Sequence, residues 1–138
     1  MNTEIQILVA GASAENVTLA KSALERLGYQ IIPANEMTLA LFLAQKNYPD
    51  LIISDSTFRL GDGMSFLKEL KLDDELSPIP FLFLISENQP FDEADAIASG
   101  ALQVLRHPIA EDELANLVDP LIIFYRQVKR VREDQTPE

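Results

Sequence analysis

The sequence contains no cysteine among its 138 residues, which excludes disulfides and thiolate metal sites. It also has no apolar run approaching the ~20 residues that a membrane-spanning helix needs. Its longest apolar stretches, such as residues 81–85, have the length of a strand. No basic region precedes the first apolar run, so a secretory signal is not expected. We therefore expect a cytoplasmic protein with no membrane partner.

Positive charge is also scarce, and the net charge is −11. Residues 1–125 carry 7 Lys/Arg against 19 Asp/Glu, whereas residues 126–138 carry 4 against 3. The acidic body should repel nucleic acid and anionic membranes, so we expect no direct nucleic-acid binding. The exception is a short basic group, which we interpret as a solvated helix end whose charges suit the helix dipole. It comprises Arg126, Lys129, Arg130 and Arg132.

Catalytic signatures are missing as well. The segment Gly11-Ala12-Ser13 has neither the further glycines nor the lysine of a phosphate-binding loop. The single histidine, His107, has no evident serine partner for nucleophilic catalysis. An enzyme or a small-ligand binder would rest on fold analogy alone, so we do not expect an enzyme.

The remaining composition is that of one globular domain, with 47% hydrophobic and 24% charged residues. Strand-like apolar runs alternate with helical periodicity along the chain. Ser13 and Asn35 are the predicted N-caps of the first two helices. The predicted strands cover residues 5–10, 29–33, 51–54, 80–85 and 102–105. The predicted helices cover 14–27, 36–47, a stretch ending near 72, 91–99, and 111 onward.

Five apolar strands separated by five helices predict an α/β fold with a parallel sheet covered on both faces. Ligand sites in such sheets lie at the carboxyl ends of the strands, near the switch in strand order. We therefore expect the functional residues to follow the predicted strands. The residues in those places are Gly11, Ala12, Ser13, Asp55, Ser86 and His107.

One segment carries a family resemblance. Residues 49–55 read PDLIISD, and Asp62-Gly63 follows seven residues after the aspartate. With the Gly100-Ala101 and His107-Pro108 pairs, this chain resembles the receiver domains of two-component response regulators, the CheY-like family. The resemblance implies a flavodoxin-like, doubly wound, five-stranded parallel sheet in the order 2-1-3-4-5. It also implies a receiver-like domain over 1–125, followed by a helix extension and tail over 126–138.

The resemblance implies a role for three positions. It makes Asp55 the phosphoacceptor, Ser86 the hydroxyl that contacts the phosphoryl group, and Thr57 the residue whose backbone carbonyl faces a magnesium ion. The alternatives are a loop-capping role for Asp55 and a local turn role for Ser86. Asp62 could be a second metal ligand, but Gly61-Asp62-Gly63 is better explained as a turn.

Four other positions depart from the family pattern. Gly11 and Ala12 replace the acidic pair, His107 replaces the lysine, and Val104 replaces the aromatic residue of the fifth strand. One carboxylate, on Asp55, would bind magnesium weakly at most, so we expect no cofactor unless the phosphoacceptor reading holds. His107 is either a pH-sensitive partner of Asp55 or a surface histidine before a proline.

Two functions follow from the resemblance. The first is an atypical pseudo-receiver that acts by protein–protein interaction, with a histidine kinase or a downstream signalling protein as partner and weak or no magnesium-dependent phosphorylation. The alternative is a functional phosphoacceptor that a histidine kinase phosphorylates on Asp55.

The last predicted helix carries an apolar a/d seam, which is typical of a coiled coil. Its earlier positions can instead pack against the sheet. Asp119-Pro120 predicts a bend or a restart of the helix. We expect the later positions to form a homodimer or relay surface. The seam comprises Leu114, Leu117, Leu121, Phe124, Val128 and Val131.

Overall fold

The computed structural model describes residues 4–135, with side chains as far as Val131. Residues 136–138 of the predicted tail and the side chain of Arg132, a member of the basic group, lie outside the described part of the chain. The strands are β1 Gln6–Ala10, β2 Gln30–Ala34, β3 Leu51–Ser54, β4 Phe81–Ile85 and β5 Gln103–Arg106. The helices are α1 Ala14–Leu24, the 3-10 turn η1 Glu25–Leu27, α2 Met37–Asn47, α3 Gly63–Lys71, α4 Glu93–Ala98 and α5 Glu111–Gln135.

The strands form one parallel sheet in the order β2-β1-β3-β4-β5, which confirms the predicted fold class. Because every strand runs in the same direction, the residues that follow the strands share one edge of the sheet. This carboxyl edge holds Gly11, Asp55, Ser86 and His107. The residues that precede the strands, such as Asp50, lie at the opposite edge.

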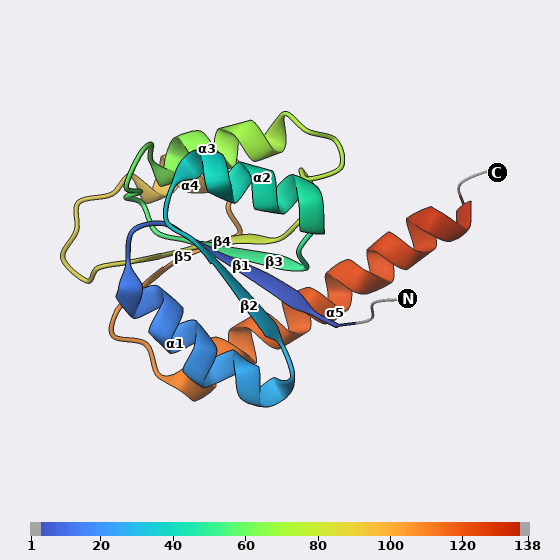
Figure 1. Ribbon diagram of the computed structural model, residues 1–138, viewed down its shortest axis with the longest axis horizontal. Helices are drawn as coiled ribbons and strands as arrows, with labels where there is room; N and C mark the ends of the chain where they lie inside the picture. The colour runs from blue at the N-terminus through green and yellow to red at the C-terminus, as the bar shows by residue number, and fades with distance from the viewer. Residues whose placement is uncertain (1–3, 136–138) are drawn as a thin grey trace.

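Helices cover both faces of the sheet, with α1 and α5 on one side and α2, α3 and α4 on the other (Figure 1). Strands β3 and β4 are buried along their whole length, and their side chains alternate between two cores. On β3, for example, Leu51 and Ile53 face the α1–α5 core, whereas Ile52 faces the other core. Burial on both faces explains why these strands are apolar up to Ser54 at the end of β3 and not alternately polar.

The helix starts are only partly as predicted. Ser13 caps α1, because its Oγ accepts a hydrogen bond from the Asn16 N–H at 3.1 Å. The prediction for Asn35 is wrong: the N-cap of α2 is Glu36, without a side-chain cap bond. The Asn35 carbonyl instead accepts from the Arg59 N–H at 2.9 Å, which ties the loop after β2 to the loop after β3.

Helix α5 runs without interruption from Glu111 to Gln135, so of the predicted bend or restart at Pro120 the restart is wrong and the bend stays a prediction. Its distal half projects from the body of the domain (Figure 1). The helix continues past Pro120 because Val118 and Ile122, on either side of the proline, are both fully buried. No break in the helix marks the predicted boundary at residue 126.

Candidate functional site

Asp55 lies directly after β3, at the carboxyl edge, and is only 8% exposed. Its Oδ1 accepts a hydrogen bond from the Ser56 N–H at 2.7 Å. Burial raises the pKa of Asp55 above its ordinary value, and the Ser56 and Thr57 N–H groups and nearby His107 offset this only in part. The carboxylate therefore lies where the fold places a reactive group, in surroundings that disfavour its charge.

The loop after β1 packs directly against Asp55. Gly11 has φ +118, and a Cβ on it would lie 2.5 Å from the Asp55 Cβ and 3.1 Å from the Thr57 carbonyl oxygen. The next residue, Ala12, donates its N–H to that same Thr57 carbonyl at 2.9 Å. The carbonyl that the resemblance assigns to a metal ion therefore already accepts a backbone hydrogen bond.

His107 follows β5, and its peptide bond to Pro108 is cis. Its side chain is 12% exposed, so His107 is a partly buried residue that still reaches the surface. The Nε2 atom lies 2.6 Å from Oδ1 of Asn16, a fully buried residue of α1. The Asn16 amide group donates to the Leu84 carbonyl at 2.8 Å, so its Oδ1 must accept and His107 Nε2 must carry a hydrogen.

The predicted pairing of His107 with Asp55 is therefore not a hydrogen bond of this structure. The hydrogen bond of Nε2 goes to α1, and the nearest carboxylate to that atom is Glu15 Oε1, at 3.7 Å. The influence of His107 on Asp55 is limited to the charge effect that lowers the Asp55 pKa in part.

Arg106 is the last residue of β5 and was not among the predicted site residues. Its Nη1 donates to three carbonyls of the loop after β4, those of Ser86, Glu87 and Gln89, at 2.8–3.1 Å. Its Nε pairs with Glu93 of α4 at 3.0 Å. This guanidinium therefore holds the loop that carries Ser86.

The other predicted site residues are dispersed. Ser86 is exposed at the end of β4. Val104 is partly buried on β5 and packs against the core on the α2–α4 side. The predicted turn over residues 61–63 is wrong: Asp62 is the N-cap of α3, accepting from the Ser65 N–H at 2.8 Å, and Gly63 is the first residue of that helix. Among residues 4–135, no group of three or more His, Cys, Asp or Glu could hold a metal ion.

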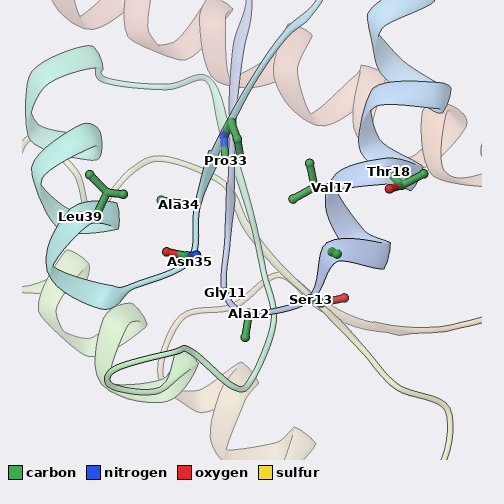
Figure 2. A pocket seen from close by; sticks show the side chains of 10 residues that line it. Gly11, Ala12, Ser13, Val17, Thr18, Pro33, Ala34, Asn35 and Leu39 are labelled. Carbon is green, nitrogen blue, oxygen red and sulfur yellow. The ribbon is translucent and has the colours of Figure 1, made fainter.

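A shallow cavity of about 440 Å³ opens beside the Gly11–Ala12 loop, between α1 and α2. Figure 2 shows Val17 and Thr18 of α1 on one side and Leu39 of α2 on the other. Its lining carries no charged side chain, and Asp55 is not part of it. The cavity therefore provides no cation for a phosphoryl group.

The predicted seam on α5 divides into two parts. Leu114 is fully buried, and Leu117 and Leu121 are partly buried. By contrast, Phe124 is 67% exposed, and Val128 and Val131 are also exposed. The earlier positions pack against the domain, as the alternative interpretation held, and the later ones leave an apolar stripe on the surface.

No helix among the described residues is long and apolar enough to cross a membrane. A family model for the response regulator receiver domain matches residues 7–119. The alkaline phosphatase synthesis transcriptional regulatory protein PhoP of Bacillus subtilis is 32% identical over 109 residues, which cover 79% of this chain and 45% of PhoP. Protein PilH of Pseudomonas aeruginosa is 24% identical over 117 residues, which cover 85% of this chain and 97% of PilH.

The chain spans about half the length of the first relatives, 45% of PhoP and 50% of a probable transcriptional regulator, ycf29, of Pyropia yezoensis. Among solved structures, the chemotaxis response regulator CheY4 of Vibrio cholerae has a TM-score of 0.76 and 26% identity, covering 86% of this chain and 99% of that one. The receiver domain of a signal transduction histidine kinase from Syntrophus aciditrophicus has a TM-score of 0.74 and 29% identity, covering 85% and 89%. The sequence match, the strand order and the aspartate after β3 agree, and the chain belongs to the family of response regulator receiver domains.

Proposed function

We propose that this receiver domain acts chiefly through protein–protein contacts, as a pseudo-receiver with weak or no magnesium-dependent phosphorylation. The observation that carries the proposal is the packing of the Gly11–Ala12 loop. It offers no side-chain ligand, lies against Asp55, and engages the Thr57 carbonyl with a backbone N–H. Magnesium needs near-octahedral oxygen ligation, with one or two carboxylates plus waters and phosphate. A single buried carboxylate, with no acidic side chain on the loop after β1, does not fit that ion.

The placement of the cations supports the same proposal. Phosphoryl transfer to Asp55 would bring two anions together, so it depends on positive charge aimed at both. His107 directs Nε2 to Asn16, and the Arg106 guanidinium is bonded to loop carbonyls and to Glu93. Neither group has a hydrogen bond to the Asp55 carboxylate, whose raised pKa reflects surroundings that favour its neutral form.

The exposed stripe on distal α5 is the proposed contact surface. Its residues Phe124, Val128 and Val131 lie at helical spacing on α5, and the first two also line a groove that α5 forms with residues 78–81, 100 and 102 of the domain. A partner helix with an apolar face, on a histidine kinase, on a downstream signalling protein or on a second copy of this chain, would cover them. Truncating Phe124 and Val128 to alanine should then abolish partner capture or self-association, without changing the helical content of the domain.

The alternative is a working phosphoacceptor. It is favoured by the position of Asp55 at the carboxyl edge and by the presence of Thr57 and Ser86 after β3 and β4. Label transfer from a histidine kinase that disappears on Asp55→Asn would establish it. Failure of transfer from several donors would count against it.

The two candidates are separated by calorimetric titration with magnesium, followed by incubation with an acyl phosphate and measurement of intact mass. The pseudo-receiver predicts no saturable magnesium binding in the millimolar range and no adduct. Binding in that range, together with a stable adduct on Asp55, would overturn it. The matched variant is Ala12→Asp with His107→Lys, since Ala12 is exposed and can accept a longer side chain. This variant should gain magnesium affinity, whereas Gly11→Asp should destabilise the fold.

A further inference from the structure

The arm of α5 is fastened to the domain by polar contacts at the amino edge of the sheet, the edge opposite Asp55. Arg126 Nε and Nη2 donate to the two carboxylate oxygens of Asp50 at 2.9 and 3.1 Å. The Asp50 carboxylate also accepts from the Gln6 N–H at 3.0 Å, and Arg126 Nη2 donates to the Glu4 carbonyl at 3.2 Å. The Asp50 side chain is 7% exposed and the Arg126 side chain 35%, so the carboxylate of this bidentate ion pair is shielded from water and the guanidinium is partly solvated.

The position of the pair along α5 gives it a particular role. Pro120 has no N–H, so α5 lacks one helical hydrogen bond there although the helix is continuous. Just before the proline, Asp119 accepts a hydrogen bond from the Tyr29 hydroxyl. Burial, together with this hydrogen bond and the Asp119 charge, raises the pKa of Tyr29 to about 12, so the hydroxyl stays a donor at physiological pH.

Beyond the proline, apolar burial soon ends. Ile122 and Tyr125 are buried, but between Arg126 and Val131 every described side chain is exposed or only partly buried. Arg126 is therefore the last side chain of α5 with long-range hydrogen bonds to the sheet among the described residues. The apolar stripe of the arm extends past this point.

We infer that Asp50 and Arg126 form a latch that fixes the distal arm of α5 on the sheet, so that the stripe of Phe124, Val128 and Val131 is presented in one direction. When the latch is closed, the arm is ordered as far as the ion pair holds it. When it opens, the described side chains beyond Arg126 retain only the position of Val128 in the lining of the groove that α5 forms with residues 78–81, 100 and 102. The latch thus controls the surface that is proposed to bind the partner. This regulatory role rests on the proposed function. The ordering of the arm by the ion pair does not depend on it.

The test is amide hydrogen exchange by mass spectrometry on the full chain. Arg126→Met keeps the aliphatic stem and removes the charge, and Arg130→Met, at an exposed position of the same helix, is the matched control. Exchange of residues 127–135 should rise about tenfold in Arg126→Met, between the effects expected for an exposed and a buried ion pair. The control should stay near the wild-type rate.

A double variant separates local release from global destabilisation. Arg126→Met alone leaves the Asp50 carboxylate buried without its cation, which also weakens the core. In Asp50→Asn with Arg126→Met that charge is gone, so the strands should recover protection while the arm stays labile. Recovery of the arm in the double variant, or equal arm exchange in Arg126→Met and Arg130→Met, would overturn the latch. Neither result would bear on magnesium binding, so the proposed function is judged separately.

Discussion

Replacing Gly11 with alanine should destabilise the domain more than the same change at Gly28. Both glycines have positive φ, +118 at Gly11 and +87 at Gly28, where an L residue is strained. They differ in surroundings: a Cβ on Gly28 would meet nothing within 4 Å, whereas one on Gly11 would lie 2.5 Å from the Asp55 Cβ. The pair therefore separates backbone strain from the steric effect of the closed loop.

The backbone strain and the steric clash each lower the free energy of unfolding, and each contribution can be estimated. A left-handed conformation costs an alanine about 1–2 kcal/mol, which is the whole effect expected at Gly28. Overpacking a rigid site adds about 1–3 kcal/mol. The atoms that face Gly11 are the Asp55 Cβ, the Asp55 nitrogen and the Thr57 carbonyl oxygen, none of them the far end of a flexible side chain. Gly11→Ala should therefore lose roughly 2–5 kcal/mol in unfolding free energy.

Urea unfolding followed by circular dichroism measures both variants, and equal m-values would show that the same transition is compared. The alanine also stiffens the unfolded chain, but it does so in both variants, so their difference isolates the clash. Gly11→Ala and Gly28→Ala with the same midpoint would refute the close packing of the loop against Asp55. That result would also remove the main support for the pseudo-receiver.

Three further predictions use the same assay or amide exchange. Burial raises the folded-state pKa of Asp55 above its unfolded value, so Asp55→Asn should stabilise the domain at pH 7. This gain in unfolding free energy should shrink as the pH falls through the folded-state pKa, and a gain that is independent of pH would contradict the prediction. Asn16→Ala deprives the partly buried His107 and a buried strand carbonyl of their partner, so it should cost about 2–4 kcal/mol, whereas Thr18→Ala on the exposed face of the same helix should cost little. Arg106→Met should cost about 1–3 kcal/mol and speed amide exchange at residues 86–89, and unchanged exchange there would show that the arginine does not hold the loop.

The fold was predictable from the sequence because its signals are local and repeated. Apolar runs such as residues 81–85 are fully buried in the structure, and the alternation of strands and helices gave the parallel sheet. The resemblance gave the strand order, which periodicity alone does not contain. The restart was predicted at Pro120 because a proline disfavours a helix locally. The burial of Val118 and Ile122, which stabilises the helix across the proline, is a tertiary effect that the local sequence does not show.

The candidate site was predictable only in its outline. The position of Asp55 followed from the motif, but the contacts that determine its chemistry join residues far apart in the chain. Asn16 lies 91 residues from His107, and nothing local marks them as partners. One signal was available: Asn16 falls four residues before Ala20 on the buried stripe of α1, and a polar residue in such a place needs a buried partner.

The same limit applies to the latch. Asp50 belongs to the phosphoacceptor motif and Arg126 to a basic group that was interpreted as a solvated helix end. That interpretation is wrong for Arg126, whose guanidinium pairs with Asp50 across 76 residues. Charge runs describe average exposure, and they cannot identify the one member that meets a buried carboxylate.

The most direct test of the pseudo-receiver is a spectrum of backbone amides recorded with and without magnesium and a phosphoryl mimic. The proposal predicts that the amide signals of Ala12, Asp55 and Thr57 stay in place at millimolar magnesium, with or without the mimic. In Ala12→Asp with His107→Lys, the same signals should shift and saturate. Saturable shifts at these amides in the unaltered chain would contradict the proposal and establish a working phosphoacceptor site.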